Sequence, residues 1–179
     1  KITKPEINIR EKLTELGYAH VPYEKMPSGS VMQTVYSEYL GSGSANESET
    51  SSSSFQPTLF EVTINPKSKN SIFKVESAPN VKSNDGTGYH TLGVFRKIGS
   101  GDFEPAGGPT STSPHGQMTL RYNSSFLWWG VVPILIYDEP NTLEPITYKI
   151  YHRISSGSYV VRVGENGADE YMSVQEIKQ

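Results

Sequence analysis

Residues 123–179 read NSSFLWWGVVPILIYDEPNTLEPITYKIYHRISSGSYVVRVGENGADEYMSVQEIKQ, and this stretch decides the fold class. Its runs of aromatic and β-branched residues are separated by short groups of Asp, Asn, Pro, Ser and Gly, of which residues 138–142 (DEPNT) form the clearest turn. The first group of residue types favours strands and the second marks turns. The stretch therefore predicts an all-β, self-associating module, and it contains no catalytic motif.

The same pattern extends toward the N-terminus. About nine segments in the whole chain have strand-like composition between turn signals: residues 31–39, 58–64, 71–77, 89–98, 117–122, 127–137, 146–154, 158–163 and 170–177. An α/β fold would need helices between these segments, and the sequence shows none there. We expect an all-β fold, an antiparallel β-sandwich of the jelly-roll type, preceded by a short N-terminal helical arm.

The segment 146–154 shows how such a strand would divide its side chains. Successive residues of a strand point to opposite faces. One face would carry Tyr148, Ile150, His152 and Ile154, and the other Lys149, Tyr151 and Arg153. The second face is amphipathic, because a tyrosine ring can be covered while its hydroxyl remains hydrated.

The first 26 residues differ from the rest and predict an arm with one amphipathic helix. Asn8 is placed as the helix cap, Glu11 completes a capping box, and Ile9, Leu13 and Leu16 form an apolar stripe. So short a helix needs a surface to pack on. Two alternatives are open: the stripe packs on its own domain, or it anchors the chain to a larger assembly, with Arg10 beside it.

Residues 27–179 would then form the sandwich domain. Within this domain, residues 41–56 are rich in Gly, Ser and Glu and contain little that could be buried. Such a composition cannot offset the entropy of ordering the chain. We expect an exposed, mobile loop there.

Composition argues against several classes of protein. The 179 residues have a net charge of −3, which gives no reason to expect nucleic acid as a partner, and the absence of Cys excludes disulfides. The longest apolar run, residues 126–137, is interrupted by Gly130 and Pro133 and is too short to cross a bilayer. The sequence as given shows no secretory signal.

Catalytic and metal-binding patterns are also missing from the sequence. The four histidines, at positions 20, 90, 115 and 152, do not occur at spacings that pair ligands on one strand or helix. No nucleophile elbow, phosphate loop or dinucleotide fingerprint occurs. Asp138 is interpreted as a structural turn residue. We expect no catalytic residues, no metal and no cofactor.

Four aromatic residues are candidates for a subunit interface or a ligand platform: Trp128, Trp129, Tyr148 and Tyr151. Because neighbouring residues of a strand point to opposite faces, one tryptophan should enter the core and the other reach a surface or a neighbouring subunit. Core or interface packing is the simpler interpretation, and a sugar-binding platform is the alternative.

Several segments together resemble a known family. Residues 4–13 (KPEINIREKL), 26–35 (MPSGSVMQTV), 137–142 (YDEPNT), 147–149 (TYK) and 174–177 (VQEI) are similar to segments of small virion structural proteins of tailed bacteriophages, of the marine phage type. These are tail-fibre-like or capsid decoration proteins. The resemblance covers both ends of the chain and hardly touches residues 41–116, and Glu139 stands where the family turn usually has Ser.

The resemblance implies a non-enzymatic component of the virion. It implies a trimer that displays its β-sandwich on the particle, with the arm residues Ile9, Arg10, Glu11, Leu13 and Leu16 as the anchor. The implied partners are further copies of the chain, other capsid or tail proteins, and a host surface glycan. The competing hypothesis is a free carbohydrate-binding β-sandwich that uses Trp128 or Trp129.

Overall fold

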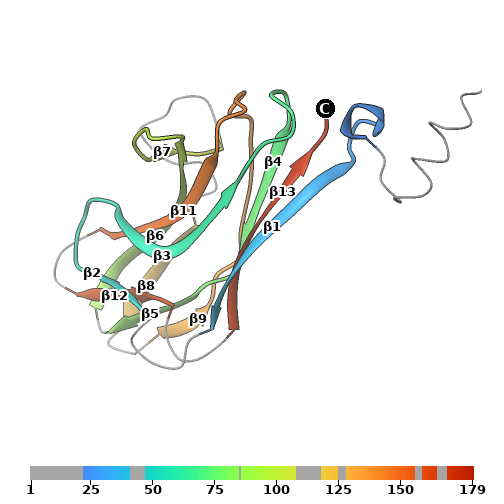
Figure 1. The fold of residues 1–179 in the computed structure, drawn as a ribbon. Coiled ribbons are helices and arrows are strands. Elements are labelled where there is room, and N and C mark those ends of the chain that lie inside the picture. The colour runs from blue at the N-terminus through green and yellow to red at the C-terminus, as the bar shows by residue number, and fades with distance from the viewer. Residues whose placement is uncertain are drawn as a thin grey trace, which may run out of the picture.

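The computed structural model describes residues 22–40, 47–84, 86–107, 118–124, 128–155, 159–164 and 169–179. In this part of the chain the structure is built from antiparallel strands, and the only helical element is the short 3₁₀ turn η1 (Tyr23–Lys25). Figure 1 shows the strands gathered into layers, with η1 beside the C-terminus. The predicted helix around Ile9, Leu13 and Leu16 lies outside the described residues.

Sheet I has four antiparallel strands. Their order across the sheet is β1 (Val31–Leu40), β13 (Asp169–Ile177), β4 (Ile72–Ser77) and β10 (Ile134–Asp138). Burial alternates along β4 and β10, so that Phe73, Val75, Ile134 and Ile136 face inward. This is the period-two pattern of strands with one covered face.

Sheet II is the second layer. Its order is β3 (Gln56–Ile64), β11 (Ile146–Ile154), β6 (Gly86–Ile98) and β7 (Glu104–Pro105), and β8 (Met118–Ser124) also pairs with β6. Along β11, each even-numbered residue from 146 to 154 is buried and each odd-numbered residue is half-buried. The division of side chains predicted for this strand is confirmed.

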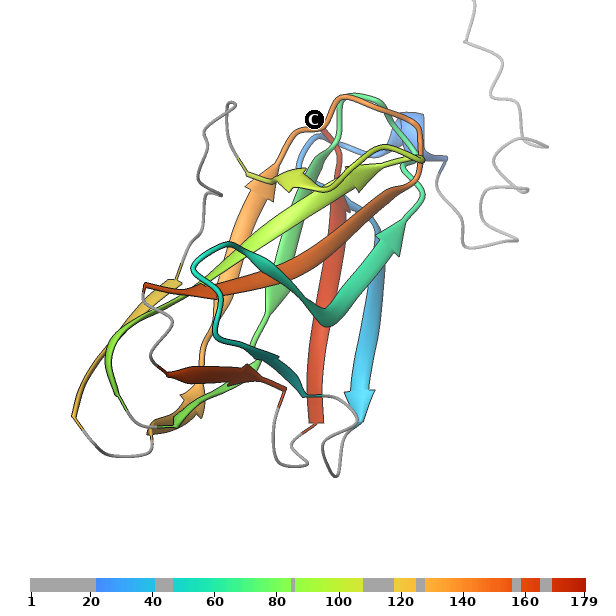
Figure 2. The same cartoon turned by 90° about the vertical axis from the view of Figure 1, so that its left-hand side faces the viewer.

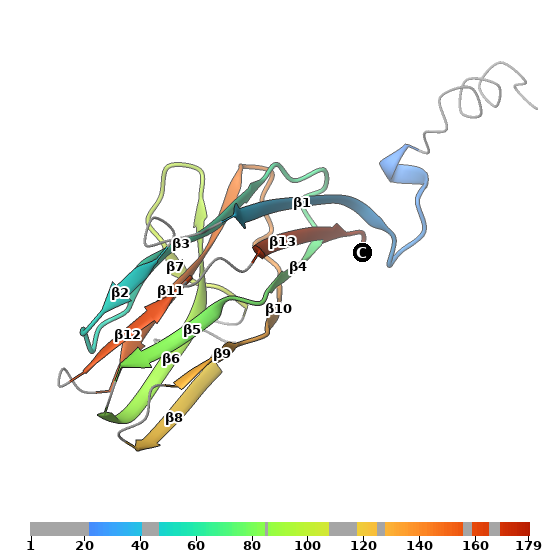
Figure 3. The same ribbon diagram turned by 90° about the horizontal axis from the view of Figure 1, so that it is seen from below.

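Sheet III consists of four short strands. Their order is β2 (Ser48–Thr50), β12 (Val160–Val163), β5 (Asn80–Asn84) and β9 (Trp128–Val131). Since β5 follows β4 and β9 follows β10 along the chain, sheet III continues from sheet I, as the view from below shows (Figure 3).

A bend separates sheets I and III. Pro79 lies between β4 and β5, and Pro133 lies between β9 and β10. Proline has no N–H to donate to a ladder, so strand pairing is interrupted at both positions. One hydrogen bond crosses the bend, from Val132 N to Pro79 O at 3.0 Å. The sequence predicted one strand over residues 127–137, and the structure divides it here.

The core fills the space between the layers. Figure 2 shows the strands of sheet II running obliquely across those of sheet I. The main buried cluster takes Phe60, Val62 and Ile64 from β3 and Met172 and Val174 from β13, together with side chains of β4, β6, β10 and β11. A smaller cluster of Ile154, Tyr159 and Val161 is linked to it by Leu120, which packs against both. The fold is thus an antiparallel β-sandwich, as predicted.

The C-terminal residues hold the segment that leads into β1. Lys178 Nζ donates to the carbonyl oxygens of Glu24 and Met26 at 2.8 and 2.6 Å. Its backbone oxygen accepts from Gly29 N, and its N–H donates to Ser30 O. Residues 24–30 are therefore fixed against the end of β13.

One part of the predicted mobile loop 41–56 is ordered. Residues 48–50 form β2, which pairs with β12, and Thr50 is buried. Composition did not reveal this, because a three-residue strand made of Ser, Glu and Thr has no apolar pattern. The loop prediction is wrong for these residues and for Gln56, which begins β3, while residues 41–46 lie outside the described part.

Candidate functional site

The four predicted platform residues do not form one site. Tyr148 and Tyr151 lie on opposite faces of β11, where Tyr148 is fully buried and Tyr151 is half-buried. Trp129 is 56% exposed on β9, and the side chain of Trp128 lies outside the described residues. Contrary to the sequence prediction, Tyr148 offers no surface to a ligand or a neighbouring subunit, because it lies on the core face of its strand.

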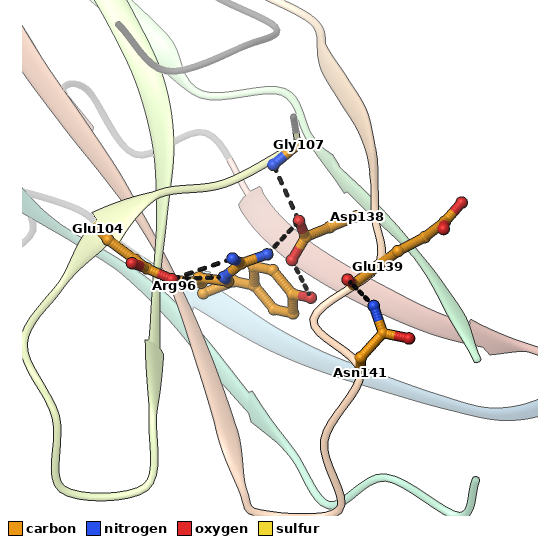
Figure 4. Close-up of polar contacts among 7 residues, drawn as sticks. Arg96, Glu104, Gly107, Asp138, Glu139 and Asn141 are labelled. Atoms are coloured by element: carbon orange, nitrogen blue, oxygen red, sulfur yellow. Dashed lines mark hydrogen bonds and ion pairs between the residues drawn. The ribbon is translucent and has the colours of Figure 1, made fainter. Parts of the chain in front are cut away.

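The hydroxyl of Tyr148 belongs to a buried polar network around Asp138 (Figure 4). The carboxylate of Asp138 is 3% exposed. Its Oδ2 accepts from Tyr148 OH at 2.9 Å, and its Oδ1 accepts from Arg96 Nη1 at 2.5 Å and from Gly107 N at 3.0 Å. Gly107 has φ +85°, a conformation that favours glycine and that directs its N–H to the carboxylate.

Arg96 links Asp138 to the surface. Its Nε and Nη2 donate to Glu104 Oε1 at 3.1 and 2.9 Å. Burial works against the guanidinium charge, but the hydrogen bonds and charges of Asp138 and Glu104 outweigh it and raise the pKa of Arg96 above its ordinary value. Burial, followed by the charge of Asp138, raises the pKa of the Tyr148 hydroxyl, which stays protonated.

This network holds strands together. Asp138 ends β10 in sheet I, while Arg96, Glu104 and Tyr148 come from β6, β7 and β11 of sheet II. Both carboxylate oxygens accept from protein donors, and the residue is buried, so the group is engaged within the protein and does not face solvent. The geometry agrees with the structural role that the sequence predicts for Asp138.

The turn after Asp138 is set by Asn141. This residue has φ +52°, a region that asparagine tolerates better than most residues. Its Nδ2 donates to Glu139 O at 2.9 Å (Figure 4). The turn predicted at residues 138–142 therefore connects β10 to β11 through local bonds.

Two histidines meet in the interior. His90 Nε2 lies 3.2 Å from His152 Nδ1, and both side chains are fully buried. Burial lowers the pKa of both imidazoles, and the charge of His152 lowers that of His90 further. No pattern in the sequence indicates this pair, because the two residues are 62 positions apart and are brought together only by the register of β6 and β11.

An apolar stripe runs along the outer face of β9 and β10. It consists of Trp129, Val131, Leu135 and Tyr137, each between 52% and 60% exposed. These strands lie at one edge of sheets III and I. We call these residues the edge stripe. Large apolar side chains gathered in this way on a surface mark sites of contact with other molecules.

The outer face of sheet I carries further aromatic side chains. Strand register places Tyr36, Ser173, Glu76 and Leu135 in one row across the sheet. Tyr36 is 65% exposed and Tyr171 is 42% exposed on the same face. The edge stripe thus continues into a surface where tyrosines alternate with small and charged residues, a composition found at protein interfaces.

The outer face of sheet II has a different character. Four rings pack against one another there: Phe95 and Tyr151 at 4.3 Å between centroids, Phe103 at 5.7 Å from Tyr151, and Phe55 at 5.2 Å from Phe95. Arg153 lies over Phe55, and Lys97 lies over Phe103. We call these six residues the cation–aromatic surface.

An open groove of about 420 Å³ lies between β1 and β3. It is lined by Val35, Tyr36, Leu59 and Glu61, among others. Among the described residues that line it, Glu61 is the only carboxylate, and this group pairs with Lys149 at 2.7 Å.

The described residues contain no group of three or more His, Asp or Glu that could hold a metal ion. Within the same part of the chain, no helix has the length and apolar character needed to cross a membrane.

Three comparisons with known proteins were made. No protein-family model matches the chain, and no curated protein matches it. Among solved structures, the chain is similar to one chain in the structure of infectious bursal disease virus, Gx strain, with 12% sequence identity and a TM-score of 0.30. The match covers 84% of this chain and 38% of the other, so the present chain spans well under half of that one. A TM-score this low adds nothing to the fold, which rests on the strand pairing described above.

Proposed function

We propose that this protein is a non-enzymatic structural component of a tailed-phage virion, an appendage that displays its β-sandwich on the particle surface. The observation that carries the proposal is the edge stripe together with the tyrosines of sheet I. A monomer gains nothing from exposing these side chains, whereas burial of apolar area between subunits stabilises an assembly by about 25 cal/mol per Å².

The positions of the phage-like segments support the proposal. GSVMQTV at residues 29–35 leads into β1, TYK lies in β11, and VQEI ends β13. Residues 137–142 form the turn between β10 and β11. Segments that are distant in sequence thus occupy paired or consecutive strands, since β1 pairs with β13.

We place the subunit interface of the proposed trimer on the edge stripe, with residues 1–26 as the arm that docks on the particle. The test is the mass of the protein in solution, measured by light scattering over a range of concentrations. A trimer is expected for the full chain. It is also expected for a chain that begins at Pro22, which keeps the bonds of Lys178 to Glu24 and Met26.

A matched pair of substitutions locates the interface. Leu135 and Leu143 are 52% and 61% exposed, but only Leu135 belongs to the edge stripe, while Leu143 lies in the turn after β10. Leu135→Asp is expected to dissociate the trimer, because a carboxylate is costly to bury without a partner. Leu143→Asp is expected to leave the mass unchanged. Dissociation by both variants or by neither would overturn this interface, and a monomeric wild-type protein would overturn the trimer.

The second candidate function is a free carbohydrate-binding module, which the exposure of Trp129 favours. An exposed indole offers a flat ring to the apolar side of a sugar. This function predicts a monomer that binds glycan without residues 1–26 and loses binding when Trp129 is changed to Ala.

A further inference from the structure

We propose that the cation–aromatic surface on sheet II is a binding site for an acidic polysaccharide, one that bears carboxylate or sulfate groups. The proposal does not depend on the virion role, because the surface lies on the layer opposite the tyrosines of sheet I. It also differs from the tryptophan platform, because it uses neither Trp128 nor Trp129.

The surface is built from sheet strands and two flanking loops. Phe95 and Tyr151 project from β6 and β11, Phe55 precedes β3, and Phe103 precedes β7. All four rings are half-buried and in contact, so they form a fixed apolar floor. Rings that are already held in place lose little conformational entropy when a ligand binds, so the free-energy cost of binding is smaller.

Cations lie over this floor. The guanidinium of Arg153 is 4.6 Å from the ring centroid of Phe55, and Lys97 Nζ is 5.2 Å from that of Phe103. Lys149 Nζ also lies over Phe103, 5.9 Å from its ring centroid. Contacts of this kind are attractive and hold the long side chains in place.

Within the residues that the structure describes, one of these three cations is ion-paired, and two are not. Lys149 forms an ion pair with Glu61. In the described part of the chain, by contrast, no carboxylate lies within ion-pair distance of Lys97 or Arg153. Among the described residues, Lys97 and Arg153 thus form a positive region on this face without an ion-pair partner. Such a region attracts an anionic ligand.

Ring geometry favours a sugar over a nucleic acid. Single-stranded nucleic acid binds by stacking its bases flat on open aromatic faces. Here cations lie over Phe55 and Phe103, and the rings of Phe95 and Tyr151 pack against each other. A carboxylate or sulfate needs only the cations, while the apolar side of the sugar ring can rest on ring edges.

The experiment is titration calorimetry of the chain of residues 1–179 with two acidic polysaccharides, polygalacturonate and heparin, and with neutral dextran, at low and at moderate salt. Binding of at least one acidic polymer is expected, with weakening as salt screens the charges and no binding of dextran. The two acidic polymers separate carboxylate from sulfate recognition.

Substitutions assign the binding to this surface. Lys97→Gln combined with Arg153→Gln is expected to weaken binding by about tenfold or more, since charge-assisted hydrogen bonds are lost. Lys97→Arg should retain it. Lys74→Gln on the outer face of sheet I is the control for Lys97→Gln alone, because each removes one positive charge. Trp129→Ala tests the rival platform. Circular dichroism melting curves check that each variant is folded.

Three results would overturn the proposal. The first is a folded wild-type protein that binds neither acidic polymer at low salt. The second is equal binding by wild type and the double variant, or loss of binding in Trp129→Ala instead. The third is a preference for a single-stranded oligonucleotide, or self-association that depends on Lys97, because either would assign the surface to another partner. A monomeric protein that still binds through Lys97 and Arg153 would contradict only the trimer.

Discussion

His90 Nε2 lies 3.2 Å from His152 Nδ1 in the interior of the sandwich, and no described group accepts from or donates to His152 Nε2. Burial holds the pKa of His152 at about 4, below the ordinary value of 6.5. The pKa of His90 is lowered by burial first and then by the charge of His152. The folded protein therefore keeps both rings neutral in a pH range where the unfolded chain takes up protons.

The pair predicts a loss of stability in mild acid. A group with a lowered pKa makes folding less favourable as the pH falls from 6.5 toward the folded value, because only the unfolded state binds the proton. Between pH 7 and pH 5 the free energy of unfolding should fall by up to about 2 kcal/mol for each histidine. Urea unfolding at several pH values measures this, and His152→Gln should reduce the slope. An unchanged slope in this variant would contradict the prediction.

Glu170 predicts a change of opposite sign. This carboxyl is 5% exposed and accepts from Asn80 N, and burial raises its pKa to about 7 even though the hydrogen bond lowers it. A raised pKa stabilises the protein at low pH, and this contribution is lost as the pH rises from 4.5 to 7. Glu170→Gln should therefore gain stability over wild type at pH 8, on the order of 2 kcal/mol, and little at pH 5. A gain of the same size at both pH values would refute the assignment.

The Asp138 network predicts unequal effects at its two ends. Asp138→Asn leaves Arg96 without its buried counter-charge and should cost about 3 kcal/mol. Glu104→Gln removes a partner that is 57% exposed and should cost less than about 1 kcal/mol. Chemical denaturation of both variants tests this, and equal losses would show that the buried pair is no stronger than the exposed one.

Glu176 is predicted to be essential for the β3–β4 turn. Its fully buried carboxylate accepts from the backbone N–H groups of Lys67 and Ser68, from Ser71 Oγ and from Gln33 Nε2. Glu176→Gln turns an amide N–H toward these donors and should cost about 2 to 4 kcal/mol. Glu76→Gln, on the exposed face of β4, is the control and should stay within about 0.5 kcal/mol of wild type. Thermal melting of both proteins decides the point.

The arm makes a prediction about assembly. Leu13→Asp places a charge on the apolar stripe and should prevent docking on the particle while leaving the melting temperature of the sandwich unchanged. Thr14→Asp adds the same charge beside the stripe and should dock normally. Sedimentation of each variant with purified particles measures docking. Docking of Leu13→Asp at the wild-type level would remove the stripe from the anchor.

The local part of the fold could be predicted from the sequence. Alternation in residues 146–154 gave the buried and outer faces of β11, and the turn at residues 138–142 gave the corner before it. Strands with weak patterns were missed, such as β2, whose three residues are Ser, Glu and Thr. Residues 48–50 form a strand because they pair with β12, and local composition does not encode this pairing.

Candidate sites were harder to predict, because each depends on contacts between distant strands. The partner of Tyr148 is Asp138, and the ring cluster around Tyr151 takes Phe55 and Phe103 from loops. Aromatic residues that are close in sequence, such as Tyr148 and Tyr151, proved to lie on opposite faces of β11. Composition identified the residue types, and only strand register showed which of them meet.

A sandwich of two layers has two outward faces that a single contact cannot cover. The edge stripe and tyrosines occupy one of them, and the cation–aromatic surface occupies the other. A neighbour bound to the first would leave the second open to solvent. Self-association and ligand capture would then be physically separable properties of one small domain, and each could change by substitution without loss of the other.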